Sequence, residues 1–127
     1  MTKSVLIVED DEGIRMSLEE LLESEGYVVR MARHGGEALE SLRLNGAPSI
    51  ILLDLMMPHV DGVSFRDQQR AAGLHVDVPV VVMSAHADMA SQRQRLGAHM
   101  YLAKPIEIDT LLDALTTTLR AARSASR

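Results

Sequence analysis

The chain has 127 residues, of which 46% are hydrophobic and 24% are charged, and its formal net charge is −5. This length fits one domain with a sizeable core, and the acidic balance argues against a nucleic-acid binder, which would present a basic face to the phosphates. Because cysteine is absent, disulfides, thiolate chemistry and zinc–thiolate sites are excluded.

The first predicted element is a short apolar strand over residues 5–8, directly followed by four acidic residues at positions 9–12. Such a run is too short for the core of a signal peptide or for a membrane span. We therefore expect a soluble, cytoplasmic protein that does not interact with a membrane. We expect its domain to cover residues 1–123, with a frayed tail at 124–127.

Strand-like and helical patterns then alternate along the chain. Short apolar runs typical of strands lie at residues 5–8, 27–31, 50–53, 78–83 and 100–103. Apolar residues at helical spacing predict helices within residues 14–22, 38–42, 63–72, 88–96 and 108–119. Gly26, Gly73 and Gly97 follow three of these helices, as is common at a helix C-terminus.

This alternation predicts an α/β fold. The runs at 50–53 and 80–83 are apolar at every position, which fits strands that are buried on both faces of a parallel sheet. Strand–helix alternation implies right-handed crossovers and helices on both faces. In such sheets ligands bind at the carboxyl ends of the strands, so functional residues are expected there.

Polar residues stand at these predicted strand ends. Glu9 and Asp10 follow the first strand, Asp54 the third, Ser84 the fourth and Lys104 the fifth. Carboxylates about 5 Å apart repel one another by roughly 3 kcal/mol at an effective dielectric constant near 20, so the acids need a counter-charge such as Mg²⁺. Asp54 could then act as a nucleophile toward phosphorus, with the metal and the ammonium of Lys104 offsetting the phosphoryl charge.

Five segments of the chain carry a family resemblance. They are 5–11 (VLIVEDD), 52–58 (LLDLMMP), Asp61-Gly62, 83–85 (MSA) and 101–106 (YLAKPI). In this order and spacing they resemble the signature blocks of two-component response regulator receiver domains of the chemotaxis-regulator kind. The resemblance covers essentially the whole chain, and it implies a flavodoxin-like five-stranded parallel sheet in the order 2-1-3-4-5.

The resemblance also implies roles for individual residues. Asp54 would accept a phosphoryl group from a sensor histidine kinase or a phosphotransfer protein. Asp10 would bind Mg²⁺ directly and Glu9 partly through water, with further ligands from Asp54 and the backbone carbonyl of Met56. Lys104 would contact the phosphate, and Ser84 would be the switch hydroxyl, where the family more often has Thr.

The remaining implied roles concern switching and signal lifetime. Tyr101 would be the switch aromatic, although it could instead simply pack against the last helix. Phosphorylation would reshape a face formed by residues 88–96, 100–103 and 106–120, to which a downstream effector would bind. Met56 and His86 would tune dephosphorylation, although His86 could equally be a solvent-exposed side chain. The resemblance further predicts a cis peptide between Lys104 and Pro105.

Three other functions compete with this interpretation. A phosphatase or phosphotransferase with an aspartyl-phosphate intermediate would need a second carboxylate at position 56, which is Met56. A degenerate receiver that binds partners without phosphorylation would be expected to lack Asp54, Lys104 or the acidic pair, and all are present. A flavodoxin-like cofactor binder would need a phosphate-binding turn after the first strand, where this chain has acids.

Overall fold

The computed structural model describes residues 3–55, 62–84 and 94–125. Five strands form one sheet in the order β2-β1-β3-β4-β5, and every neighbouring pair is parallel. The elements in chain order are β1 (Lys3–Val8), α1 (Glu12–Ser24), β2 (Tyr27–Ala32), α2 (Gly35–Asn45), β3 (Ile50–Asp54), α3 (Gly62–Ala71), β4 (Val80–Ser84), β5 (Met100–Ala103) and α5 (Ile108–Ala125). The predicted fold class and strand order are confirmed.

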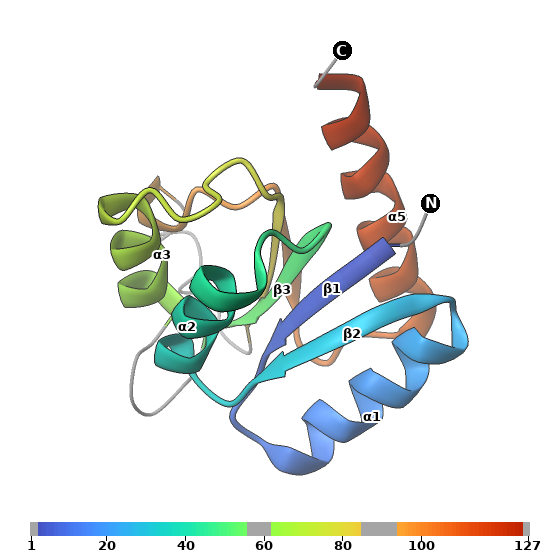
Figure 1. Ribbon diagram of the computed structural model, residues 1–127. Coiled ribbons are helices and arrows are strands. Elements are labelled where there is room, and N and C mark those ends of the chain that lie inside the picture. The colour runs from blue at the N-terminus through green and yellow to red at the C-terminus, as the bar shows by residue number, and fades with distance from the viewer. Residues whose placement is uncertain (1–2, 56–61, 85–93, 126–127) are drawn as a thin grey trace.

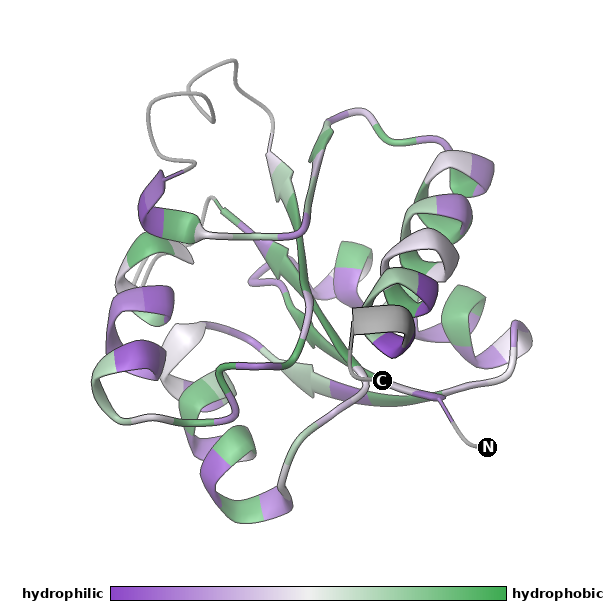
Figure 2. Cartoon of the chain, turned by 90° about the horizontal axis from the view of Figure 1, so that it is seen from above, coloured by the Kyte–Doolittle hydropathy of each residue, from purple (hydrophilic) through white to green (hydrophobic). Residues whose placement is uncertain are grey.

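The core forms two layers because successive side chains of a strand point to opposite faces of the sheet. Leu6 and Val8 of β1 pack on one face with Phe65 of α3 and with residues of α2. Val5 and Ile7 pack on the other face with α1 and α5. Figure 1 shows these two pairs of helices on opposite sides of the sheet, and Figure 2 shows the same layers from above.

Most predicted boundaries agree with the structure to within two residues, although α2 (Gly35–Asn45) and α5 (Ile108–Ala125) extend further than predicted. β4 begins at Val80, two residues after the predicted start at Val78. The N–H of Val78 donates to the carbonyl of His75 in a turn. Pro79 has no N–H and so cannot donate a hydrogen bond to a neighbouring strand. The predicted helix at 88–96 lies mostly outside the described residues.

The apolar stripe predicted on the first helix is only partly covered. Leu22 is fully buried against the sheet, whereas Leu18 is half-buried and 43% of Ile14 is exposed. Gly26 has a φ of 91°, a left-handed conformation that suits glycine and turns the chain from α1 into β2. The stripe therefore presents an apolar face beside α5 as well as to the sheet.

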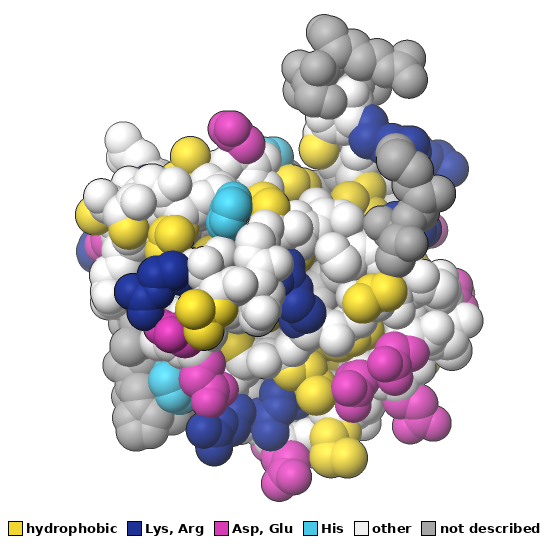
Figure 3. Space-filling view, in the orientation of Figure 1, with side chains coloured by type: hydrophobic (Ala, Val, Ile, Leu, Met, Phe, Trp, Pro, Cys, Tyr) yellow, Lys and Arg dark blue, Asp and Glu magenta, His cyan; other side chains and the backbone are white. Residues whose placement is uncertain are grey.

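The surface is mixed in character. On the face seen in Figure 3, acidic and basic side chains are interspersed with small hydrophobic patches. Exposed large hydrophobic side chains include Leu44, Val28 and Met16. Within the described parts of the chain, no helix is both long and apolar enough to cross a membrane.

Candidate functional site

The sheet brings the predicted polar residues to one edge. In the parallel ladders Val8 is paired with Leu53, Asp54 with Met83, and Ser84 with Ala103. The carboxyl ends of β1, β3, β4 and β5 are therefore aligned. The residues that follow or end these strands must converge there, as the sequence predicts.

Three acidic side chains meet at this edge. Glu9, Asp10 and Asp54 each offer a carboxylate oxygen, and these oxygens all lie within 4.8 Å of one another. Glu9 and Asp54 are buried, with 1% and 2% exposure, while Asp10 is exposed. The cluster thus has a buried floor and an open side toward solvent.

Glu9 carries the strongest electrostatic perturbation in this cluster. Burial, together with the adjacent Asp54 carboxyl, raises its pKa from 4.5 to about 8, since two close carboxylates resist ionising together. Its Oε2 accepts the N–H of Asp11 at 3.2 Å. Its Oε1, although buried, has no hydrogen-bond partner among the described residues. A buried oxygen without a donor, facing two other carboxylates, fits a hard divalent cation such as Mg²⁺.

Lys104 supplies the positive charge nearest to the acids. Its Nζ lies 3.2 Å from Oδ1 of Asp54 and 3.8 Å from Oε1 of Glu9. Its backbone N–H donates to the carbonyl of Ser84 at 2.7 Å, which attaches the residue to the end of β4. The peptide bond between Lys104 and Pro105 is cis, as predicted.

The residues expected to act as a switch lie on β4 and β5. Ser84 is completely buried at the end of β4. Tyr101 is half-buried and packs against the core on the α2 and α3 side, and its hydroxyl accepts the N–H of Ala98 at 3.0 Å. Met56 and His86 lie outside the described residues.

The loop that carries Glu9 and Asp10 is held from both sides. Asp11 caps α1 by accepting the N–H of Ile14 at 2.8 Å, the role expected of an acid at a helix start. Arg15 donates from Nη1 to the carbonyl of Glu9 at 3.0 Å and to that of Asp10 at 3.4 Å. Sequence reasoning missed Arg15, although a basic residue one helical turn after an acidic strand end was a usable signal.

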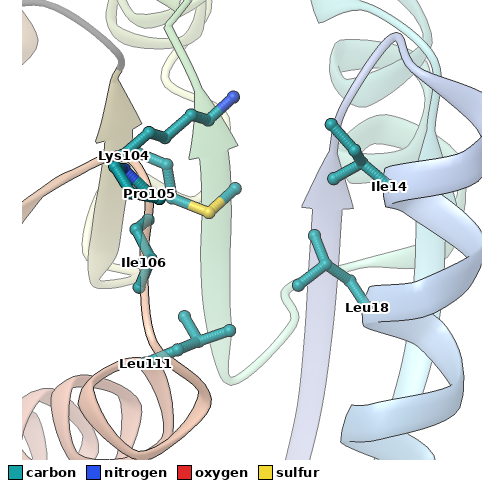
Figure 4. A pocket seen from close by; sticks show the side chains of 7 residues that line it. Ile14, Leu18, Lys104, Pro105, Ile106 and Leu111 are labelled. Carbon is teal, nitrogen blue, oxygen red and sulfur yellow. The ribbon is translucent and has the colours of Figure 1, made fainter.

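An apolar groove of about 480 Å³ adjoins the acidic cluster. Figure 4 shows Ile14 and Leu18 of α1 facing Pro105, Ile106 and Leu111 across it. The hydrocarbon chain of Lys104 also lines the groove, although its amine contacts the acids. The uncovered stripe on α1 is therefore continuous with the charged site.

The arrangement is suited to phosphoryl transfer. Asp54 is a buried carboxylate with a cation beside it and two further acids that could hold a metal. A carboxylate can attack phosphorus, and positive charge on the phosphoryl oxygens stabilises the transition state. Because Lys104 and the other two acids all lie close to Asp54, charges of both signs are within reach of one phosphoryl group on that residue.

Comparison with known sequences agrees with this chemistry. The family model described as the response regulator receiver domain matches residues 5–116. Response regulator MprA of Mycobacterium sp. (strain KMS) is 37% identical over 122 residues, covering 94% of this chain and 52% of MprA. Sporulation initiation phosphotransferase F of Bacillus subtilis (strain 168) is 32% identical over 115 residues, covering 91% and 92%. The chain spans about half the length of the MprA relatives that it matches.

Solved structures agree as well. Chemotaxis protein CheY4 of Vibrio cholerae superposes with a TM-score of 0.84 at 27% identity, covering 93% of this chain and 99% of CheY4. The CheY-like receiver domain protein of Methanospirillum hungatei JF-1 superposes with a TM-score of 0.87 at 27% identity, covering 98% and 99%. With the acidic cluster, the lysine and the strand order all in place, the chain belongs to the response regulator receiver domains of two-component signalling systems.

Proposed function

We propose that this receiver accepts a phosphoryl group on Asp54 from the phosphohistidine of a sensor histidine kinase or a phosphotransfer protein. One carboxylate oxygen of Asp54 bonds to phosphorus as the P–N bond of the donor breaks. The electron pair of that bond stays on the imidazole nitrogen, which takes up a proton. The observation that carries the proposal is the Lys104 amine 3.2 Å from a buried Asp54 that lies among other acids.

The neighbouring residues each have a part in this step. Glu9, Asp10, Asp54 and the backbone carbonyl of Met56 would hold Mg²⁺, which supplies positive charge to the phosphoryl oxygens when it is bound. Lys104 would contact a phosphoryl oxygen from the opposite side, and Ser84 would donate a hydrogen bond to another. The match to nearly the full length of a bacterial phosphotransferase supports the proposal that this site takes part in phosphoryl transfer.

The output would be a two-state change in shape. A phosphoryl group on Asp54 adds negative charge and acceptor oxygens, toward which Ser84 and Lys104 would move. Tyr101 would follow and reshape the face formed by residues 88–96, 100–103 and 106–120. A downstream effector protein or domain in the cytoplasm would recognise that face, so the chain acts as a signalling module rather than as an enzyme with a separate substrate.

The lifetime of the phosphorylated state would depend on the path of a water molecule toward phosphorus. Met56 and His86 would flank this path, two positions after Asp54 and Ser84 respectively. Met56 has no polar group with which to orient water, so it would slow hydrolysis. His86 could donate to the phosphoryl group and would make hydrolysis depend on pH around neutrality.

The test is intact-protein mass spectrometry after incubation with acetyl phosphate and Mg²⁺. The wild type is expected to gain the mass of one phosphoryl group, and Asp54→Asn to gain none. Asp113→Asn, which alters an exposed aspartate on α5, is the matched control and should behave like the wild type. Equal incorporation in Asp54→Asn would refute the acceptor assignment. No incorporation in the wild type would favour a degenerate receiver that binds partners without phosphorylation.

A further inference from the structure

Helix α3 buries two polar side chains that the proposed phosphorylation site does not use. Arg66 is only 4% exposed and Gln69 is fully buried, beside the apolar core residues Val63 and Phe65. Buried arginine is uncommon in proteins and normally has a partner of opposite charge. Within the described residues, no carboxylate forms an ion pair with Arg66.

The guanidinium of Arg66 instead binds backbone carbonyls of a distant segment. Its Nε donates to the carbonyl of Leu96 at 2.7 Å and its Nη2 to that of Gly97 at 3.3 Å, while its Nη1 donates to the side chain of Gln69. Burial lowers the pKa of Arg66 to about 10, so the group remains charged at neutral pH. All three nitrogens are therefore engaged, two of them by residues some thirty positions along the chain.

Arg70, one helical turn further along α3, binds the same segment. Its Nη2 donates to the carbonyl of Leu96 at 2.7 Å, and its Nη1 donates to the carbonyl of Arg95. Gly97 has a φ of 57°, and a Cβ at this position would collide with the Arg70 guanidinium. We name residues 95–98 the strap, because they join the preceding part of the chain to β5 and lie against both arginines.

The other end of the strap is bound to Tyr101. The N–H of Ala98 donates to the Tyr101 hydroxyl at 3.0 Å. Tyr101 and Ala98 also pack against the core layer that contains Phe65 and Leu96. The carbonyls of the strap are thus bound by α3 and its last N–H is bound by the Tyr101 phenol, so the strap connects the two.

We propose that Arg66 is a positioning residue for Tyr101. By holding the carbonyls of Leu96 and Gly97, it places the N–H of Ala98 where the Tyr101 hydroxyl can accept it. Without this attachment the strap relaxes and the Tyr101 ring leaves its present position more often. The link to signalling depends on the proposed switch role of Tyr101, whereas the positioning itself does not depend on phosphorylation.

The composition of the chain allows a direct test, because Tyr27 and Tyr101 are its only tyrosines. The 127-residue chain labelled with 3-fluorotyrosine should give two fluorine NMR resonances, and the Tyr27→Phe variant assigns them. We expect Arg66→Met, which keeps a long apolar stem in the core, to shift or broaden the Tyr101 resonance and to leave that of Tyr27 unchanged. Amide exchange at Ala98 should become about tenfold faster, the effect of losing one ordinary hydrogen bond.

Two further variants keep the proposal falsifiable. Gln68→Met introduces the same side chain at an exposed position of α3 and should leave both resonances in place. Arg66→Lys retains the charge and can reach one carbonyl, so it should move the Tyr101 resonance less than Arg66→Met does. If Arg66→Met does not fold, Arg66→Lys replaces it as the test variant. A lowered unfolding midpoint with an unchanged Tyr101 resonance and unchanged Ala98 exchange would overturn the proposal. An equal shift in Gln68→Met would overturn it as well.

These measurements use no phosphoryl donor and no Mg²⁺. A failure to phosphorylate Asp54 would therefore leave the result on Arg66 intact. Conversely, loss of the positioning effect would not alter the assignment of Asp54 as the acceptor.

Discussion

The molecule contains two buried polar clusters of opposite sign that are built differently. At the carboxyl edge of the sheet, Glu9 and Asp54 are buried together, and Oε1 of Glu9 has no hydrogen-bond partner among the described residues. On α3, Arg66 uses all three of its nitrogens, and Gln69 donates to the carbonyls of Leu74 and His75 at 3.0 and 3.3 Å. One buried oxygen of the first cluster thus lacks a hydrogen-bond donor among the described residues, whereas each nitrogen of Arg66 has an acceptor.

This difference in hydrogen bonding distinguishes a ligand site, the acidic cluster, from a structural cluster, the one on α3. A buried polar group without a partner costs free energy, so an orphaned carboxylate oxygen beside two other acids indicates a cluster completed by a ligand. The buried guanidinium of Arg66 has an acceptor at each nitrogen and connects α3 to a segment some thirty residues later. Substitutions should therefore impair binding at the first cluster and stability at the second.

The largest expected effect is on metal binding. Asp10→Ala removes the exposed acid of the cluster and should weaken Mg²⁺ binding more than about 100-fold, because even residues that only hydrogen-bond to a metal ligand typically contribute 10–100-fold. Phosphorylation by acetyl phosphate should be lost with it. A calorimetric or NMR titration with Mg²⁺ measures the affinity. Glu12→Ala, which removes a nearby exposed acid in the first turn of α1, is the control, and equal weakening in both variants would contradict the ligand assignment.

The second effect concerns the structural cluster on α3. Gln69→Leu leaves Nη1 of Arg66 and the carbonyl of Leu74 without their Gln69 partner, whereas the carbonyl of His75 keeps the N–H of Val78. This change should lower the free energy of unfolding by about 2–4 kcal/mol. Urea denaturation measures this loss. Adding Arg66→Met should recover part of it, because the stranded charge is removed as well. Strict additivity of the two changes would argue that Arg66 and Gln69 do not act as a unit.

The third effect is a pH dependence of the metal-free protein. The folded-state pKa of Glu9, about 8, lies above its ordinary value of 4.5, so the folded state retains a proton that the unfolded state has lost. The stabilisation is complete below about pH 4.5 and disappears as the pH rises through about 8, with a slope of at most about 1.4 kcal/mol per pH unit for one proton.

Chelator-treated protein should therefore become less stable from about pH 5 to about pH 8, and Mg²⁺ should reverse the trend by binding the ionised cluster. Glu9→Gln should flatten the profile, because the amide cannot ionise beside Asp54. Denaturation at several pH values provides the measurement, and Glu20→Gln on the exposed side of α1 provides the control. If the stability of Glu9→Gln depended on pH as steeply as that of the wild type, the titrating group would not be Glu9.

The smallest effect concerns competition between two cations. The Lys104 amine lies where it partly neutralises Asp54 and Glu9, and a bound Mg²⁺ would face the same carboxylates. Lys104→Met should therefore raise Mg²⁺ affinity by about two- to fivefold, since one partly screened charge is removed. Lys3→Met, at the opposite end of β1, replaces the only other lysine and should have no effect. Weaker Mg²⁺ binding in Lys104→Met would mean that the lysine organises the acids rather than competing for them.

The acidic site was predictable from the sequence because sheet geometry alone determines it. Strand ends in a parallel sheet meet at one edge, so Glu9, Asp54 and Lys104 could be placed together without knowledge of any side-chain contact. The cluster on α3 was not predictable in this way. Arg66 and Gln69 look like the polar face of a solvated helix, and only the strap, some thirty residues later, supplies the carbonyls that allow their burial.

The groove between α1 and α5 has a thermodynamic consequence of its own. Lys104 lines this groove, and its amine contacts Asp54. An occupant that displaces this side chain changes the charge felt at Asp54, and linkage then requires a modification of Asp54 to change the affinity of the groove by the same factor. Through the position of Lys104, binding in the groove and modification of Asp54 would thus be thermodynamically coupled.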